Sequence, residues 1–201
     1  MIIVDCVQGT PEWDECRLGI PTASEFDKIL TTKGEPSKQA QKYLYRLAGE
    51  RVSRMKEDFY KNAIMERGNV VEEEARHFYD VLNDVTVERV GFCYGNESKT
   101  FGCSPDGLVG KDGLVEIKCP IQSTHVGYLL DGGLPMDYFQ QVQGELFVTG
   151  RKWLDFISYY PAIKPLVVRV VRDEKFIRAL TIELEVFCRN LNEIVEKIKI
   201  K

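Results

Sequence analysis

The sequence predicts a mixed α/β (α+β) fold in which helices flank short strands. The chain has 201 residues, 44% of them hydrophobic and 29% charged, which suffices for a full core and is typical of a globular domain. Apolar residues recur at helical spacing over 38–56 and 173–200, whereas residues 101–119 alternate apolar and polar as strands do. We therefore expect residues 1–201 to form a single domain.

The composition excludes several classes of protein. No apolar run approaches the roughly 18 residues of a membrane span, and the start of the chain lacks the basic segment of a signal peptide. The six cysteines are scattered without a C-x-x-C pair, which argues against a zinc or iron–sulfur site and indicates reduced thiols in a cytoplasmic protein. The net charge is −4, so DNA binding would need basic residues concentrated on one surface.

The first part of the chain predicts two short helices, over 12–17 and 23–30, the second capped by Thr22 or Ser24. Arg17 is a candidate phosphate clamp, because a guanidinium binds phosphate oxygens bidentately. Ser24 would add a hydroxyl at a helix N-terminus, which favours anions. A surface arginine and an ordinary helix cap would explain the same residues.

A third helix, over 38–56 and capped by Ser37, has a basic face. Lys38, Lys42 and Arg46 recur every four residues, as does Arg54 two turns later, with Glu50 the only acid between them. In an acidic protein such a stripe is either a track for the DNA backbone or a solvated helix face.

The next helix, over 66–82, has an apolar face beside which Glu72 lies. Glu72 therefore either points into a site or belongs to the solvated run 72–74. His77 has no partner at metal-ligand spacing, and we expect it to be structural. Residues 85–94 then predict a strand.

The stretch 102–119 predicts a β-hairpin, with extended runs at 102–109 and 114–119 joined by a turn with Asp-Gly. Side chains alternate along a strand, so Glu116 and Lys118 share one face and Asp106 lies roughly opposite Glu116. Neighbouring carboxylates repel each other, and a hard cation such as Mg²⁺ removes the conflict. A surface hairpin with an ordinary Glu-Lys pair is the alternative.

The last part predicts helices over 123–130 and 136–149, strands over 153–160 and 166–172, and a helix to about residue 200 capped by Asp173. Gln141 and Gln143 stand among apolar residues, where their amides need hydrogen-bond partners. Those partners lie either in the core or on a substrate.

Several of these residues occur in an order that resembles a known family. Pro105-Asp106, followed after nine residues by Glu116-Ile117-Lys118, resembles the signature of PD-(D/E)XK nucleases. The wider set is similar to the phage lambda exonuclease (YqaJ-type viral recombinase) branch of that superfamily, over about residues 9–160. Its motifs are Trp13-x-x-x-Arg17-x-Gly19 with Ser24, M-E-R-G-N-x-x-Glu72, Ser104-Pro-Asp106, and Gln140-Gln-Val-Gln143.

The resemblance implies a central mixed β-sheet flanked by helices, the core of restriction endonucleases. It also implies Mg²⁺-dependent 5′→3′ digestion of one strand of linear duplex DNA, leaving a 3′ single-stranded tail. Two Mg²⁺ ions per site are expected, with Mn²⁺ as a substitute. Phosphodiester hydrolysis by two ions needs neither a histidine nor a covalent nucleophile.

The resemblance also implies roles for single residues. Asp106 and Glu116 would be metal ligands with the Ile117 carbonyl, and Lys118 would position or activate the attacking water. The remaining roles are an acid in the site for Glu72, support of the scissile region for Gln141, and binding of the 5′-terminal phosphate for Arg17, Ser24 and Ser104.

The family further implies a ring-shaped homotrimer threaded by DNA, with Lys38, Lys42 and Arg46 on the channel wall. Its partner would be a single-strand annealing protein, and its place the cytoplasm of a bacterial host of the phage. Two alternatives stay open: a PD-(D/E)XK endonuclease, which cuts closed circular DNA, and a non-catalytic protein that binds DNA ends.

Overall fold

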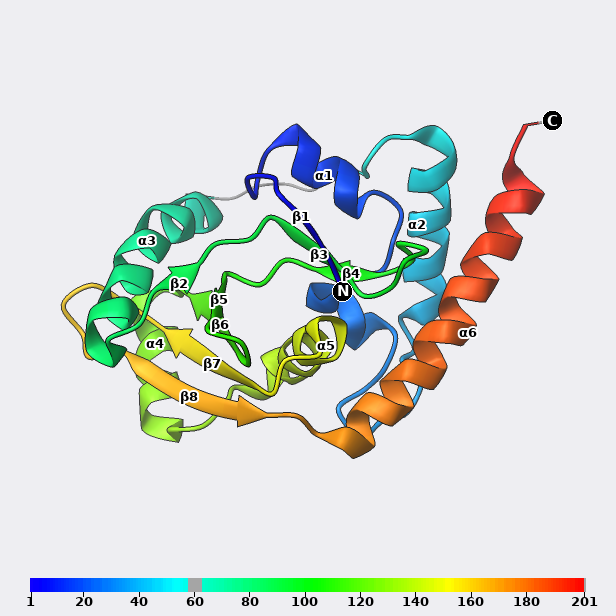
Figure 1. The fold of residues 1–201 in the computed structure, drawn as a ribbon. Helices are drawn as coiled ribbons and strands as arrows, with labels where there is room; N and C mark the ends of the chain where they lie inside the picture. Colours follow the sequence, from blue (N-terminus) through cyan, green and yellow to red (C-terminus); the bar gives the residue numbers. More distant parts are fainter. Residues whose placement is uncertain (58–62, 201) are drawn as a thin grey trace.

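The structure, a computed structural model, describes residues 1–57 and 71–200 in full and the backbone of residues 63–70. Its strands form two sheets (Figure 1). The larger sheet has the order β2-β5-β6-β7-β8, in which only the β6–β7 pair is parallel. Its strands are β2 (Val87–Glu88), β5 (Gly107–Val109), β6 (Gly113–Lys118), β7 (Trp153–Ser158) and β8 (Leu166–Val171). The smaller, antiparallel sheet has the order β1-β3-β4, from Ile2–Val4, Phe92–Tyr94 and Gly102–Cys103.

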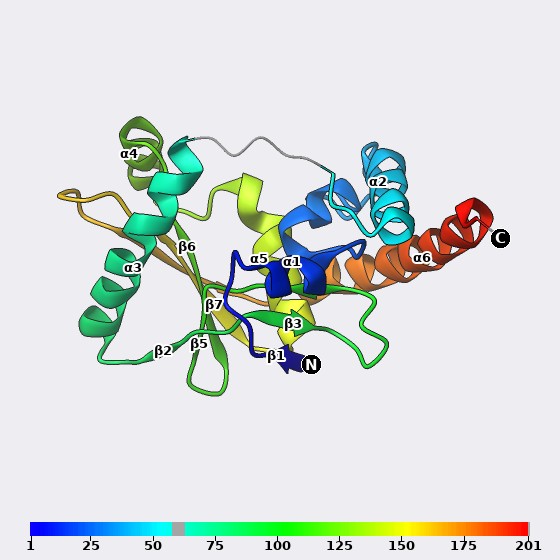
Figure 2. The same cartoon turned by 90° about the horizontal axis from the view of Figure 1, so that it is seen from above.

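Helices lie at both ends of the molecule and between them. The α-helices are α1 (Pro11–Arg17), α2 (Ala40–Ser53), α3 (Ala63–Asn83), α4 (Gln122–Asp131), α5 (Phe139–Thr149) and α6 (Glu174–Ile198), and the 3₁₀ helices are η1 (Ala23–Lys28) and η2 (Met136–Tyr138). In two perpendicular views, α3 and α4 lie at one end, α2 and α6 lie at the other, and α5 lies between (Figures 1 and 2). The predicted mixed sheet flanked by helices is thus confirmed. None of the described helices combines the length and apolarity needed to cross a membrane.

The large sheet is covered on both faces, as the packing of the β6 side chains shows. Val115 and Ile117 point to the side of α3, where they pack with Ala75 and Tyr79. Leu114 points to the opposite side, where it packs with Val142 and Leu146 of α5 together with Leu154 and Phe156 of β7. This alternation places Glu116 and Lys118 on the α5 side of the sheet.

Two predicted strands are wrong in their extent. The run 85–94 divides into β2 and β3, and the run 102–109 divides into β4 and β5, because the chain passes from one sheet to the other within each run. At the first crossing Gly91 lies against Cys6, where an added Cβ would be 2.2 Å from the Cys6 carbonyl oxygen. Strand β1 was not predicted at all.

The predicted helices agree better, with local corrections. Residues 23–28 form a 3₁₀ helix, in which Thr22 occupies the N-cap position as predicted, although its side chain makes no capping hydrogen bond. Helix α2 begins at Ala40 and ends at Ser53, where Arg54 takes a left-handed backbone conformation. Asp173 caps α6 as predicted, its carboxylate accepting the N–H groups of Lys175 and Phe176 at 3.0 Å.

Candidate active site

The hairpin of β5 and β6 brings the predicted motif together. Gly107 pairs with Val115, so Asp106, one residue earlier, lies opposite Glu116 as predicted. The Oδ2 atom of Asp106 accepts the backbone N–H of Ile117 at 2.6 Å. The Lys118 ammonium lies 2.5 Å from Glu116 Oε1. Asp106, Glu116 and Lys118 therefore meet at the end of one strand pair.

The backbone N–H and C=O groups of Ile117 point to the side of β6 on which Asp106 lies. The Lys118 carbonyl accepts the N–H of Tyr159, on the side of β7. Successive residues of a strand direct their N–H and C=O groups to opposite edges, so the Ile117 carbonyl points to the side of Asp106, like the Ile117 N–H. That oxygen thus lies on the Asp106 side of β6, in the residue that follows Glu116.

Helix α5 adds an amide and a further acid. Gln141 Nε2 donates to Glu116 Oε1 at 2.5 Å and to Glu145 Oε1 at 3.0 Å. Glu116 and Glu145 are 2% and 1% exposed. Gln143 instead bonds to the backbone of Val171 and Asp173, which is the core role left open for it.

Sequence reasoning missed Glu145. A signal was present, because residues four apart share a helix face, and Glu145 is four residues after Gln141. Its burial, however, comes from the tertiary packing of α5 against the sheet and η1.

Helix α3 contributes Glu72, which the buried Arg76 of the same helix links to Asp106. Arg76 Nη2 lies 2.6 Å from Glu72 Oε1 and donates to the Asp106 carbonyl at 3.3 Å. The Glu72 side chain remains 30% exposed, at the margin of the site. His77 is exposed on the same helix. We call Glu72, Asp106, Glu116 and Glu145, with Lys118 and Gln141, the carboxylate cluster.

Crowding perturbs the acids of this cluster. Burial, reinforced by Glu116 and Glu72, raises the pKa of Asp106 well above its usual value. Burial and Glu116 do the same to the pKa of Glu145. Burial opposes the charge on Lys118, but Glu116 and Asp106 outweigh it and raise the Lys118 pKa. Perturbed groups of this kind concentrate at functional sites.

Two oxygens of the cluster lack partners. Glu116 Oε2 and Glu145 Oε2 are buried and accept no hydrogen bond, which is costly for a carboxylate. In the described part of the chain, no three acidic, histidine or cysteine side chains are placed to ligate one ion. Mg²⁺ commonly takes only one or two carboxylates and fills its shell with water, so Asp106, Glu116 and the Ile117 carbonyl fit such an ion.

The three residues predicted to bind a phosphate are linked through neighbouring residues, and within the described part of the chain no hydrogen bond joins them directly. The Arg17 guanidinium lies 4.0 Å from the centre of the Trp13 ring, and Trp13 Nε1 donates to Ser104 Oγ at 2.8 Å. Ser24 Oγ is 3.3 Å from Thr22 Oγ1, and Thr22 bridges to Gly102. Burial lowers the pKa of Arg17, and within the described residues its guanidinium has no hydrogen-bonded acceptor.

Three of the four residues of the predicted basic stripe line a hollow of about 730 Å³, which we call the basic hollow, whereas Arg54 pairs with Glu15. Its lining residues are Lys28, Lys38, Gln39, Lys42, Tyr43, Tyr45, Arg46 and Glu57. Lys38 and Lys42 are exposed. Arg46 differs from them, because its side chain is largely buried, pairs with Glu25 and lies 3.6 Å from Glu50. The charge of Arg46 is therefore paired within the protein, and its main role is to form the wall of the hollow.

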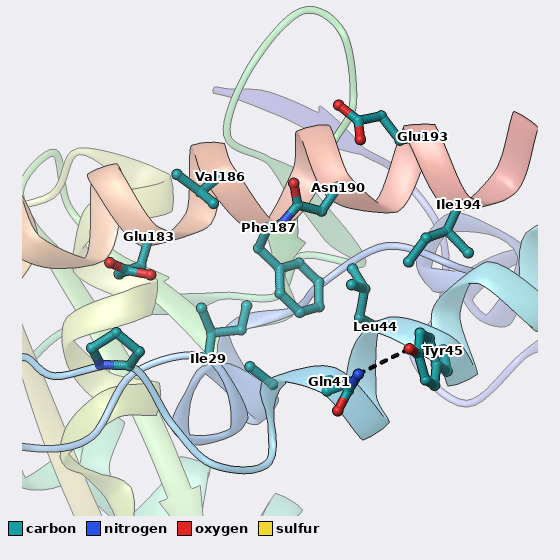
Figure 3. A pocket seen from close by; sticks show the side chains of 12 residues that line it. Ile29, Gln41, Leu44, Tyr45, Glu183, Val186, Phe187, Asn190, Glu193 and Ile194 are labelled. Atoms are coloured by element: carbon teal, nitrogen blue, oxygen red, sulfur yellow. Dashed lines mark hydrogen bonds between the residues drawn. The ribbon is translucent and has the colours of Figure 1, made fainter.

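A smaller hollow of about 380 Å³ lies between α2 and α6 (Figure 3). Leu44, Phe187 and Ile194 form its apolar part, and Gln41 donates to Tyr45 at its rim. It shares no lining residue with the carboxylate cluster.

The order of these motifs agrees with one protein family. The sequence model of the YqaJ-like viral recombinase domain matches residues 12–152. The chain belongs to this family. The matched range contains the whole carboxylate cluster together with Arg17, Ser24 and Ser104. Comparison with curated proteins gave no match.

Solved structures extend the comparison beyond the matched range. An alkaline exonuclease from Laribacter hongkongensis, LHK-Exo, shares 34% identity with this YqaJ-like chain at a TM-score of 0.85, covering 94% of this chain and 96% of that one. Its complex with dAMP matches equally well. A phage-related exonuclease from Haemophilus somnus 129PT, at 14% identity and a TM-score of 0.69 over 90% of this chain and 96% of that one, shares the fold. The family and the LHK-Exo match support a nuclease role.

Proposed function

We propose that this YqaJ-like chain is a Mg²⁺-dependent 5′→3′ exonuclease that degrades one strand of linear double-stranded DNA and leaves a 3′ single-stranded tail. The observation that carries the proposal is the carboxylate cluster. There Asp106, Glu116 and Lys118 meet at one strand end, with Gln141 bonded to Glu116. Similarity to LHK-Exo, described as an alkaline exonuclease, agrees with it.

The chain's own residues divide the work of hydrolysis. Asp106 and Glu116, with the Ile117 carbonyl, would hold the cation, and Glu72 is the acid at the margin of the site. When bound, Mg²⁺ stabilises negative charge on phosphate oxygens and lowers the pKa of water. Lys118 has three donors, with which it positions the attacking water and offsets charge that develops on the phosphate. Gln141 fixes Glu116 and supports the scissile region from α5.

The 5′→3′ direction of digestion would come from recognition of the 5′-terminal phosphate. Arg17 is held against Trp13, and Trp13 bonds to Ser104, which is two residues before Asp106. A phosphate at Arg17, Ser24 and Ser104 would thus be bound beside the reacting carboxylates. An end without that phosphate would lose a charge-assisted contact.

Duplex DNA would be tracked by the basic hollow. Lys38 and Lys42 are exposed there and would neutralise phosphates, while Arg46 holds the wall. We further propose a ring-shaped homotrimer with this wall inside. A single-strand annealing protein would use the 3′ tail for phage-type recombination in the bacterial cytoplasm. Two Mg²⁺ ions per site, replaceable by Mn²⁺, complete the proposal.

The test uses three substrates: linear duplex with a labelled 5′-phosphate, the same duplex with 5′-hydroxyl ends, and closed circular DNA. We expect release of nucleotides from the phosphorylated strand with Mg²⁺, none with a chelator, and no cutting of circles. Cutting of circles would instead establish the endonuclease alternative. Binding of ends without any product would establish the non-catalytic alternative.

A further inference from the structure

Glu145 is a buried acid for which the proposed reaction has no use. It lies on α5 with 1% of its surface exposed. Its Oε1 accepts the Gln141 amide at 3.0 Å, whereas its Oε2 is buried without a partner. An acid retained in the core only to hold Gln141 would need no second oxygen, because an amide oxygen would accept the same bond. The unpartnered Oε2 therefore points to a ligand.

The same amide joins Glu145 to the metal-binding residues. Gln141 Nε2 donates to both Glu145 and Glu116, and Glu116 Oε2 is the second buried oxygen without a partner. Two unpartnered carboxylate oxygens thus belong to residues bridged by a single nitrogen. One bound species is the simplest group that would satisfy both.

The charges of the cluster indicate what that species is. Its four carboxylates, Glu72, Asp106, Glu116 and Glu145, face the cations Lys118 and Arg76. Glu73, which also pairs with Arg76, is exposed and is shared with Arg89. When all four acids are ionised, the cluster has an excess of two negative charges, which one divalent cation balances.

We propose that Glu145 is an additional acidic residue of the metal centre, and that its Oε2 accepts a hydrogen bond from a water in the shell of the cation. This inference rests on the proposed metal-dependent function. Because no three such side chains in the described residues are placed to ligate one ion, contact through water suits Glu145 better than direct ligation. Mg²⁺ usually keeps several waters, and groups that bond to a metal's ligands tune its affinity.

Glu145→Gln tests the inference, since glutamine keeps the size and the acceptor for Gln141 but removes the charge. Mn²⁺ would be titrated calorimetrically into the full chain without DNA, so that the readout is binding and not activity. We expect the variant to bind Mn²⁺ about 10-fold more weakly, or worse. Glu185→Gln, at an exposed position of α6, is the matched control and should bind as the wild type does.

Glu145→Met, an apolar side chain of similar length, gives a second reading if the glutamine variant folds poorly, as judged by circular dichroism. Affinity within twofold of the wild type in either folded variant would overturn the inference and leave Glu145 a structural acceptor for Gln141. That result would not affect the proposed nuclease. Absence of Mn²⁺ binding by the wild type would overturn both.

Discussion

In the carboxylate cluster, four acids crowd around few cations, and two carboxylate oxygens are buried without partners. In the basic hollow, by contrast, Lys38 and Lys42 remain exposed, and Glu57 is the one acid among the lining residues, while Glu25 and Glu50 contact Arg46 behind the wall. One region is short of positive charge and the other offers it. The comparison teaches how a chain with a net charge of −4 could act on DNA: acids gather where the proposed cation would bind, and exposed lysines lie along the proposed path of the DNA.

The largest effect is expected from Asp106→Ala. Asp106 accepts the Ile117 N–H of the strand that carries Glu116, and it would hold the proposed cation. Its removal should therefore lower the cleavage rate by at least about 10³-fold, or about 4 kcal/mol in activation free energy. Affinity for DNA should change little, because the basic hollow is untouched. Single-turnover cleavage and fluorescence anisotropy measure the two quantities. Loss of binding comparable to the loss of rate would mean that the two regions are not separate.

Lys118→Met should lower the single-turnover rate by about 10²–10³-fold, the usual effect of losing one donor to a developing charge. Lys111→Met is the matched control, because Lys111 is an exposed lysine in the turn of the same hairpin. The control should cleave at the wild-type rate. Equal effects of the two changes would indicate a general loss of charge and not a role at the cluster.

Arg17→Ala should abolish the preference for a 5′-phosphate over a 5′-hydroxyl end, a loss of about 10–100-fold in discrimination, as expected for hydrogen bonds to a charged group. Competition between the two kinds of duplex end measures it. Arg189→Ala, exposed on α6, should keep the preference. A variant at Arg17 that still discriminates would place the phosphate elsewhere.

The smallest effect on chemistry is expected from Lys38→Ala with Lys42→Ala. This pair should reduce the slope of log affinity against log salt by about 2, since each phosphate contact contributes about 0.9. Cleavage at saturating protein should stay near the wild-type rate. Lys111→Ala with Lys175→Ala, both at exposed positions, should leave the slope unchanged. A slope equal to that of the wild type in the Lys38 and Lys42 variant would remove the basic hollow from the DNA path.

The two regions also differ in how far the sequence predicts them. Asp106, Glu116 and Lys118 were placed correctly because a strand has a fixed period and a hairpin turn fixes the register. Glu145 was not, since burial of a helical acid depends on what packs over it, and that contact comes from a distant part of the chain.

The same dependence on distant parts of the chain explains why two strands were predicted with the wrong extent. The runs 85–94 and 102–109 keep an extended pattern through the points where each passes between sheets, so periodicity does not reveal the crossings. In and just before α2, the four-residue spacing correctly predicted that Lys38, Lys42 and Arg46 share one face, whereas Arg54, at the C-cap, pairs with Glu15. It did not distinguish Arg46, whose partner Glu25 comes from η1, from the exposed lysines.

One measurement tests most directly the separation of chemistry and DNA binding. The single-turnover rate at saturating protein and the affinity for a 5′-phosphorylated duplex in Ca²⁺, which is expected to support binding without cleavage, would be determined together for three proteins. These are the wild type, Asp106→Ala, and the Lys38→Ala and Lys42→Ala variant. The account predicts a change in rate alone for Asp106→Ala and a change in affinity alone for the lysine variant. Rate and affinity falling together in both variants would contradict it.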